Sequence, residues 1–265
     1  MTKTDLNSII RSINLSIGYQ DKKNKTFIAK DIDLSLNKGN LVCLLGENGI
    51  GKSTLLRTLT KVQPKLSGEI LFEGRKLETI ANTELAKKMS LVLTEKIPES
   101  NLTVYELIAL GRQPYTNWLG NLSTEDKNQI QLAVKQTNIL EIICKKHYEL
   151  SDGQLQKVMI ARALAQNTEI ITLDEPTAHL DIHNKIEIFN LLKKLSQELN
   201  KTILISTHEI HLALQLADEL WLMNKDSIIC GKTNELIANG SVANLFSSDL
   251  VTFDLKSKQF IINHH

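Results

Sequence analysis

The chain has 265 residues, of which 42% are hydrophobic and 23% are charged, so it can bury one sizeable core and its composition excludes intrinsic disorder. Lys and Arg number 31 and Asp and Glu number 30, so the charge balance excludes an overall field that favours nucleic acid, and we expect no nucleic-acid partner. No segment approaches the roughly eighteen consecutive apolar residues that a membrane-spanning helix needs, so we expect any membrane role to be peripheral.

The cysteines and the start of the chain both favour the cytosol. Cys43, Cys144 and Cys230 are far apart and lack the spacing of metal ligands, and Cys43 lies in an apolar run where a free thiol acts as a small hydrophobe. The N-terminal stretch MTKTDLNSII has no apolar signal-peptide core. A reducing cytosol is therefore the expected compartment.

The first 45 residues predict antiparallel strands on either side of the polar segment DKKNK. The residues expected to share a face are Ile13, Leu15, Ile17 and Tyr19 in the first strand, and Ile32, Leu34 and Leu36 in the second. After a helix over TLLRTLTKV, the segment SGEILFEGRKL predicts another hairpin, which leads to a strand over residues 90–93.

Between the second strand and that helix lies a glycine-rich segment, GENGIGKST, directly after the apolar run of residues 41–45. A buried strand that runs into a glycine-rich turn and a helix start directs several backbone N–H groups at one point, where phosphate binds. Lys52 supplies a charge for the β and γ phosphates, and the Ser53 hydroxyl is a suitable ligand for Mg²⁺. A chance match is expected on the order of once in a hundred chains of this length. This segment is called the phosphate loop. Its residues expected to bind phosphate are Gly46, Glu47, Asn48, Gly49, Ile50, Gly51, Lys52, Ser53 and Thr54.

Residues 98–150 predict a helical insertion. TVYE, from Thr103, and STED, from Ser123, are typical helix starts, and the apolar residues that follow recur at helical spacing. From residue 151 the pattern alternates helices with strands over 169–173, 202–206 and 219–223. This alternation predicts an α/β fold with a parallel sheet covered on both faces.

A second chemical element is the strand that ends in Asp174 and Glu175. An apolar strand with two carboxylates at its carboxyl end brings negative charge to the crevice where open α/β sheets bind ligands. Asp174 is expected to hold Mg²⁺ as a Walker B aspartate does, which leaves Glu175 to orient and deprotonate the attacking water. A strand that merely stops at a polar turn explains the segment about equally well alone, but not beside a phosphate loop.

The third element is LSDGQ at residues 150–154, ahead of the helical stretch LQKVMIARALA. Ser151 and Gln154 form a Ser-x-x-Gln capping box, and most such boxes do no more than start a helix. This pentapeptide, however, differs in one residue from LSGGQ, the signature of ABC ATPases, and the chain resembles an ABC transporter nucleotide-binding subunit. The resemblance implies that Ser151, Gly153 and Gln154 contact the ATP held by the phosphate loop of a second copy, in a homodimer that closes around two ATP molecules.

Further landmarks of the family follow in order. Ala178-His179-Leu180-Asp181 resembles the D-loop, which touches the opposing copy, and the resemblance assigns this contact to Asp181. Ser206-Thr207-His208-Glu209 resembles the switch region, in which His208 contacts the γ-phosphate and holds the catalytic geometry. A lone histidine at a strand end is usually a surface residue, but its place after the carboxylate strand favours the switch.

Three positions either allow a second interpretation or depart from the family pattern. Tyr19 stands where the family stacks an aromatic ring on adenine, although packing in the core beside Ile17 explains it nearly as well. Asp152 replaces the commonest glycine of the signature, and its carboxylate would repel the ATP phosphates unless it points away or serves in the helix cap. Glu95 stands where the family has the Q-loop glutamine. We expect Glu95 to reach the metal region as a third carboxylate.

The resemblance covers nearly the whole chain and implies an α/β P-loop NTPase, with a RecA-like parallel sheet core, an N-terminal antiparallel β subdomain and a helical insertion. The expected single ABC ATPase domain, residues 1–265, divides into a β lobe with the phosphate loop (1–95), a helical subdomain with the signature (96–155), a core with the carboxylates and the switch (156–240) and a C-terminal tail (241–265). Alternating apolar residues in the tail predict a small added hairpin, in a packing role.

Residues 101–115, NLTVYELIALGRQPY, indicate which group of ABC ATPases the chain resembles. They resemble the start of the helical insertion in ATPases of iron-siderophore, haem and cobalamin importers, with Gly111-Arg112 followed by Pro114-Tyr115. The resemblance implies a bacterial type II importer of a metal chelate, with an iron complex ranked above haem or cobalamin. It also implies ATP and Mg²⁺ as cofactors, integral membrane permease subunits as partners, a substrate-binding protein as an indirect partner, and a peripheral place on the cytoplasmic face of the inner membrane.

Other classes share parts of this pattern. A soluble ATPase of Fe–S cluster assembly, or another metal or small-solute importer cassette, shares every nucleotide motif. A chromosome or DNA-repair ATPase would carry a long coiled coil between Ser53 and Ser151, where the sequence has no sustained heptads, and a translation factor would carry two cassettes. A non-catalytic ATP sensor would differ in that hydrolysis would not depend on Glu175.

Overall fold

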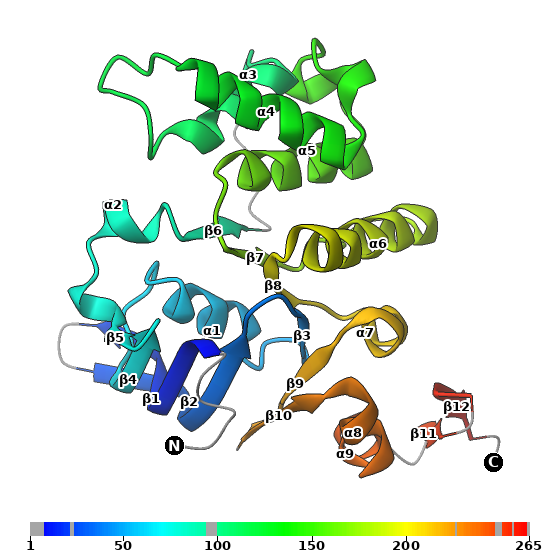
Figure 1. The fold of residues 1–265 in the computed structure, drawn as a ribbon. Helices are drawn as coiled ribbons and strands as arrows, with labels where there is room; N and C mark the ends of the chain where they lie inside the picture. Colours follow the sequence, from blue (N-terminus) through cyan, green and yellow to red (C-terminus); the bar gives the residue numbers. More distant parts are fainter. Residues whose placement is uncertain are drawn as a thin grey trace.

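The computed structural model of this chain describes residues 8–21, 24–93, 100–225, 227–246, 251–255 and 257–263. Two sheets with their covering helices occupy the lower part of Figure 1, and a helical region lies above them. No helix in those ranges combines the length and the apolar character needed to cross a membrane.

Four strands form an antiparallel sheet in the order β2-β1-β4-β5. Their bounds are β1 Ser8–Asp21, β2 Asn24–Asn37, β4 Ser67–Phe72 and β5 Arg75–Lys76, which confirms the predicted strands and the second hairpin. β1 is irregular, because Asn14 has a φ of 48° and the pairing with β2 shifts register on either side of it. Farther along β1, Ile17 is buried whereas Tyr19 is 57% exposed, so Tyr19 does not pack in the core beside Ile17.

Six strands form the central sheet in the order β10-β9-β3-β8-β7-β6. Their bounds are β3 Leu41–Leu45, β6 Met89–Val92, β7 Ile170–Asp174, β8 Thr202–Ser206, β9 Glu219–Met223 and β10 Ile228–Lys232. The pairs between β9, β3, β8, β7 and β6 are parallel, and only β10 pairs antiparallel, at one edge. The predicted parallel sheet is therefore confirmed, and its strands fall within one residue of the expected ranges.

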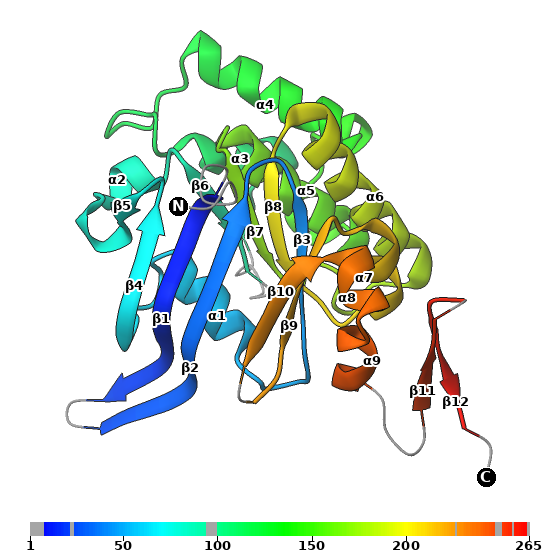
Figure 2. The ribbon, with the colours of Figure 1, turned by 60° about the horizontal axis from the view of Figure 1, so that its bottom comes forward.

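Strand β3 separates two hydrophobic cores. Leu41, Cys43 and Leu45 belong to the core shared with the helices on one face of the sheet. Val42 and Leu44 belong to a second core, between the central sheet and the antiparallel sheet, which also contains α1 (Lys52–Leu59). Figure 2 shows α1 beneath β1 and β2, on the other side of the sheet from the later helices. Burial raises the pKa of the Cys43 thiol, so this cysteine is an inert packing residue, as expected.

Helices cover the rest of the molecule. The α-helices are α2 Asn82–Leu85, α3 Val104–Ala109, α4 Thr124–Thr137, α5 Asp152–Ala165, α6 Ile182–Leu199, α7 Ile210–Leu216, α8 Thr233–Ala238 and α9 Ser241–Phe246. Short 3₁₀ helices are η2 Leu77–Thr79, η3 Leu110–Arg112, η4 Leu140–Ile142 and η5 His147–Glu149. Thr103 and Ser123 cap α3 and α4 with complete capping boxes, so both predicted helix starts are confirmed.

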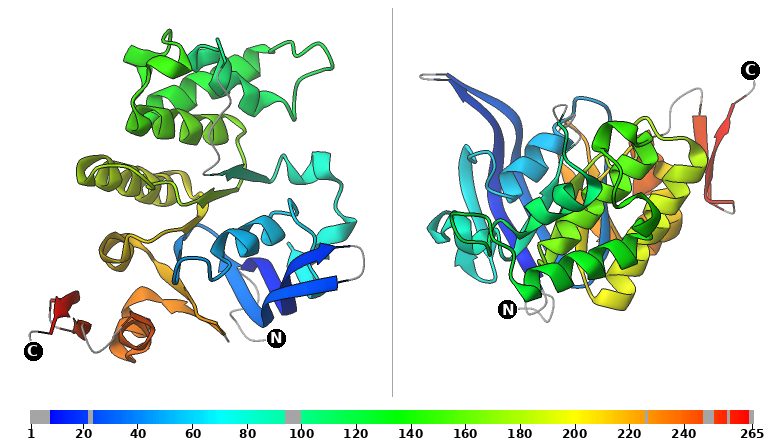
Figure 3. Two further views of the ribbon diagram at one scale, coloured as in Figure 1. Left: turned by 180° about the vertical axis from the view of Figure 1, so that it is seen from behind. Right: turned by 90° about the horizontal axis from the view of Figure 1, so that it is seen from above.

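The C-terminal tail forms the predicted hairpin, from β11 (Val251–Asp254) and β12 (Gln259–Ile262). Figure 3 shows it at the opposite end of the molecule from the β1–β2 hairpin. Phe260 of β12 lies at the centre of an aromatic cluster, with its ring centroid 4.8 Å from Phe253, 5.8 Å from Phe246 and 6.5 Å from His211. The hairpin is therefore anchored to α7 and α9 by packing.

A buried ion pair holds the helical region together. Arg112, singled out above in the segment 101–115, is 3% exposed, and its Nε donates to Asp126 Oδ1 at 2.8 Å. Its Nη1 donates to the carbonyl of Ala165 at 2.7 Å, at the end of α5. Its guanidinium stacks 3.9 Å from the ring centre of Tyr115. Arg112 and Tyr115 of this segment thus have a structural function, because the arginine joins η3, α4 and α5.

Removal of this arginine is expected to destabilise the fold. Arg112→Met leaves Asp126 charged and buried without its partner, which costs about 3 kcal/mol of unfolding free energy. Denaturant midpoints measure the loss, and Lys194→Gln, in an exposed pair with Glu198, is the control that changes stability by less than about 0.5 kcal/mol. Equal denaturant midpoints for Arg112→Met and Lys194→Gln would show that the Arg112–Asp126 pair does not stabilise the fold.

The pH dependence of stability gives an independent check of the same pair. Hydrogen bonds from Ser123 and Arg112 hold the pKa of Asp126 below its ordinary value of 3.8, against the effect of burial. A depressed folded-state pKa stabilises the fold above the unfolded pKa, and the stabilisation is lost as pH falls through the folded value. The parent chain should therefore lose stability in acid below about pH 4 more steeply than Asp126→Asn.

Candidate functional site

The phosphate loop connects the centre of the main sheet to α1. All five residues of β3 are buried, and α1 begins at Lys52. Gly51, the residue before α1, has a φ of 112°, and a Cβ atom there would collide with the side chain of Ile28. Glycine is therefore required at this turn. Glu47, Asn48 and Gly49 form the exposed crest of the loop.

Lys52 lies at the centre of the loop with its ammonium group enclosed. Its Nζ donates to the carbonyl oxygens of Gly46 at 3.0 Å and Glu47 at 2.9 Å, and the residue is 4% exposed. Burial lowers the pKa of Lys52, whereas the nearby carboxylates of Glu175 and Asp174 act in the opposite direction. The phosphate loop thus encloses the positively charged ammonium group of Lys52.

Asp174 and Ser53 bring two hard oxygen ligands together. Ser53 Oγ donates to Asp174 Oδ1 at 2.9 Å, and Asp174 is 2% exposed. Within the described ranges no three His, Cys, Asp or Glu side chains cluster as a metal site. A hydroxyl and a carboxylate still fit Mg²⁺, because this ion usually takes one or two protein ligands and completes its shell with water and phosphate oxygens. Glu95, the third expected ligand, lies outside the described residues.

Glu175 and His208 meet beside Lys52. His208 Nε2 lies 2.8 Å from Glu175 Oε1 and 3.2 Å from Lys52 Nζ. When Nε2 carries a proton it donates to Glu175, and when it is bare it accepts from Lys52. Both side chains are about one-third exposed, at 30% for Glu175 and 36% for His208, so water reaches them. The pair thus places a carboxylate and an imidazole side by side where water reaches both.

Ser206, the last residue of β8, orients both carboxylate residues. Its Oγ donates to Asp174 Oδ1 at 2.6 Å and accepts from the backbone N–H of Glu175 at 2.9 Å. Glu175 has a φ of 47°, a conformation uncommon for a residue with a side chain, and the Ser206 carbonyl also accepts from the Glu175 N–H at 3.1 Å. The sequence places Ser206 in the switch segment, but its position opposite Asp174 depends on strand register.

Tyr19 borders the same site from β1. Its hydroxyl lies 3.2 Å from Thr54 Oγ1 in the first turn of α1, and 57% of the residue is exposed. The ring is therefore open to solvent next to the phosphate loop. This position favours stacking on a bound base over packing in the core.

The signature and D-loop residues lie at two other helix starts, those of α5 and α6. Ser151 caps α5, with the Gln154 N–H donating to Ser151 Oγ and the Ser151 N–H donating to Gln154 Oε1, as predicted. Asp181 caps α6, and hydrogen bonds from Asn184 hold the pKa of Asp181 below its ordinary value. Figure 1 shows α5 in the upper helical region and α1 well below it, beside β3. Ser151, Asp152 and Asp181 are exposed, so they remain available to another molecule.

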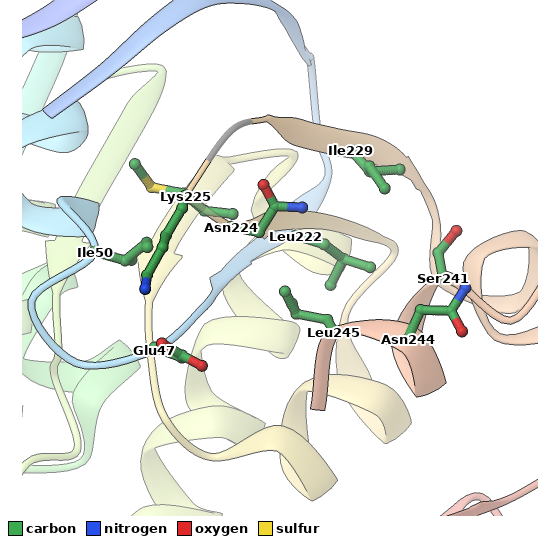
Figure 4. Close-up of a pocket in the computed structure, with 10 residues that line it drawn as sticks. Glu47, Ile50, Leu222, Asn224, Lys225, Ile229, Ser241, Asn244 and Leu245 are labelled. Atoms are coloured by element: carbon green, nitrogen blue, oxygen red, sulfur yellow. The ribbon is translucent and has the colours of Figure 1, made fainter. Parts of the chain in front are cut away.

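A cavity of about 370 Å³ adjoins the phosphate loop but is not the centre of this chemistry. Figure 4 shows its walls, which come from the loop, the end of β9, β10 and α9: Glu47, Ile50, Leu222, Met223, Asn224, Lys225, Ile229, Ser241, Asn244 and Leu245. Lys52, Asp174 and His208 do not line it. The candidate site is therefore defined by the convergence of charged side chains and not by the size of this cavity.

Comparisons with known proteins agree with this geometry. Residues 29–178 match the family model described as ABC transporter. An uncharacterised ABC transporter ATP-binding protein of Methanocaldococcus jannaschii is 38% identical, over 95% of this chain and 83% of the relative. The probable siderophore transport system ATP-binding protein YusV of Bacillus subtilis is 36% identical, over 91% of this chain and 86% of the relative.

A similar protein has been solved as a dimer. A bacterial ABC transporter cassette, solved as a dimer, superposes with a TM-score of 0.72 at 29% identity, over 84% of this chain and 98% of the cassette. The same cassette was also solved as a dimer in a post-hydrolysis state with ADP and Pi. The phosphate loop, the carboxylate strand and the switch histidine thus occur in the fold of an ATP-hydrolysing cassette, and this chain belongs to the ATP-binding subunits of the ABC transporter family.

Proposed function

We propose that this chain binds and hydrolyses ATP to energise the uptake of an iron chelate through a separate membrane permease. The observation that carries the hydrolytic part is the line of contacts from Lys52 through His208 to Glu175, at 3.2 Å and 2.8 Å. The siderophore transport system named for the Bacillus subtilis relative supports an iron complex as cargo, with haem or cobalamin as less favoured alternatives.

In this proposal ATP lies along the phosphate loop. Backbone N–H groups of residues 46–54 and the start of α1 bind its phosphates, and Lys52 supplies a fixed positive charge. The exposed ring of Tyr19 stacks on the adenine. Ser53 and Asp174 would hold Mg²⁺, which supplies positive charge to the phosphate oxygens. Glu95 stays a proposed third ligand.

Hydrolysis then depends on Glu175. Its carboxylate is partly exposed and its backbone is fixed by Ser206, so it can accept a proton from a water held beside the loop. His208 contacts the same carboxylate and the Lys52 ammonium, and these contacts support a role for its imidazole as a contact to the terminal phosphate of ATP. The partial exposure and fixed backbone of Glu175 support its role as the base.

A second copy completes the site. Ser151 and Asp181 are exposed at the starts of α5 and α6, and the start of a helix favours anions. We propose that Ser151, Gly153 and Gln154 of one copy cover the ATP of the other, with Asp181 at the contact between copies. The dimeric state of the similar cassette supports this arrangement. ATP then closes the homodimer, and hydrolysis opens it.

The transport role places the dimer on a membrane. We propose that the helical region docks on a permease at the cytoplasmic face of the bacterial inner membrane, and that a substrate-binding protein delivers the chelate to that permease. We propose that the chain is a single ATPase domain with four parts, residues 1–95, 96–155, 156–240 and 241–265. The cassette moves the permease through its opening and closing and does not touch the cargo.

Glu175→Gln is expected to abolish turnover and keep ATP binding. Loss of a general base lowers kcat by about 100-fold or more, because no carboxylate accepts the proton of the attacking water. Phosphate release measures kcat and equilibrium dialysis measures ATP affinity. Glu198→Gln, in an exposed surface pair, is the matched control and should keep the parent rate. A Glu175→Gln chain that hydrolyses ATP at the parent rate would be evidence for a different base.

ATP should join two copies of the hydrolysis-deficient chain. Glu175→Gln with ATP is expected to sediment as a dimer and without ATP as a monomer, and adding Ser151→Ala should weaken this dimer by about tenfold because a charge-assisted contact to phosphate is lost. Thr103→Ala removes a comparable helix cap outside the proposed interface and should leave the dimer intact. A dimer that tolerates Ser151→Ala as well as Thr103→Ala would contradict the role of the signature.

Copurification tests the transport role. When the tagged chain is isolated from detergent-solubilised membranes of its source cells, a polytopic permease should accompany it. The expected permease is encoded next to a substrate-binding protein for an iron chelate. Recovery of a soluble Fe–S assembly scaffold in place of a permease would identify the soluble class of ATPase and refute the importer.

A further inference from the structure

The first turn of α6 contacts three different motifs through two consecutive residues. Asn184 and Lys185 are both half-buried and follow Asp181 by three and four positions. Asn184 contacts the D-loop and the signature helix, whereas Lys185 contacts the switch segment. The contacts with the signature helix and the switch segment are not evident from the sequence, because the partners lie 31 and 24 positions away in the chain.

Asn184 joins the D-loop to the signature helix. Its Nδ2 donates to Asp181 Oδ2 at 2.6 Å, and its N–H donates to Asp181 Oδ1 at 2.9 Å. Its carboxamide also lies so close to Gly153 that a Cβ atom at this position would meet Asn184 Cγ at 2.6 Å. Glycine at position 153 thus permits a close approach of α5 to the carboxamide, so Asn184 contacts both motifs.

A second contact fixes α5 to α6 one turn farther along. Lys157 Nζ lies 2.6 Å from Glu187 Oε2, and the lysine side chain is 22% exposed. Lys157 is one helical turn after Gly153, and Glu187 is nearly one turn after Asn184. The two helices are therefore in contact at two successive turns.

Lys185 connects that turn to the switch. Its Nζ lies 2.6 Å from Glu209 Oε1, and the two side chains are only 24% and 25% exposed. Glu209 directly follows His208, and its N–H donates to Thr207 Oγ1 at 3.0 Å. By contrast, the Lys194–Glu198 pair on the same helix spans 3.8 Å with both side chains more than half exposed. The Lys185–Glu209 pair is thus better placed to transmit a displacement.

We propose that Asn184 and Lys185 are positioning residues that couple the two ATP sites of the dimer. The inference rests on the proposed function, in which the signature and D-loop of a chain belong to the ATP of its partner, whereas His208 belongs to the ATP of its own chain. Engagement of α5 by the partner's nucleotide is passed through Asn184 to the first turn of α6 and through Lys185 to Glu209. The occupancy of one site thereby sets the position of His208 relative to Glu175 in the other site.

Lys185→Gln tests the coupling in the full-length chain. It removes the ion pair and keeps Asp181, Asn184 and the nucleotide site. We expect kcat to fall by at least about fivefold, a common size for coupling between sites, while KM for ATP changes less than about twofold. The Hill coefficient of the ATP dependence should fall towards one. Lys185→Arg should retain most of the rate because it keeps the pair, and Lys194→Gln is the control without effect.

A second comparison separates coupling from loss of structure. Asn184→Ala should lower kcat, and the double variant with Lys185→Gln should lose little more than the more impaired single variant, because both residues lie on one path. The thermal midpoint of Lys185→Gln should remain within a few degrees of the parent. Fully multiplicative losses of kcat, or a thermal midpoint that falls in step with kcat, would overturn the proposal.

The dimer assay distinguishes this inference from the function on which it rests. In the Glu175→Gln background, Lys185→Gln should still dimerise with ATP, since the signature contacts are intact. If Glu175→Gln stays monomeric with ATP, both the proposed dimer and the proposed coupling are wrong. If the dimer forms and Lys185→Gln keeps the parent kcat and Hill coefficient, the coupling alone is wrong.

Discussion

The parallel register of β3, β8 and β7 is the constraint on which the site depends. Ser206 pairs with Leu44 on one side and with Asp174 on the other, so three strand ends meet at one edge of the sheet. Because parallel strands end on the same side, the loop after β3 and the carboxylates after β7 face one another without further adjustment. The 2.6 Å bond from Ser206 to Asp174 is a direct consequence of this register.

Burial and charge act together at this edge. Lys52 and Asp174 are nearly inaccessible, and each would be costly to bury without opposite charge nearby. Burial lowers the pKa of Lys52, and the carboxylates that oppose this shift also belong to the site. Glu175 and His208 remain partly exposed, so water reaches both side chains. The buried members thus fix position, and the exposed members are free for chemistry.

The rest of the molecule packs around this edge through specific side-chain contacts. Arg112 joins α4 to the end of α5 in the helical region. The first turn of α6 lies in contact with both α5 and the switch segment. On the other side of the chain, α9 and the C-terminal hairpin pack against the body through aromatic side chains. The helical region and the C-terminal hairpin are therefore both held by contacts between distant residues.

Local backbone chemistry explains what the sequence by itself determined. The phosphate loop, the buried strands β7, β8 and β9, and the caps at Thr103, Ser123 and Ser151 follow from short patterns whose physical causes lie within a few residues, and the structure contains all of them. Only the tertiary structure decided the exposure of Tyr19, the two contacts of Ser206, the Arg112–Asp126 pair and the Lys185–Glu209 pair. Glu95 at the metal remains a prediction. These features depend on strand register and helix packing between residues distant in the chain, which periodicity and composition do not encode.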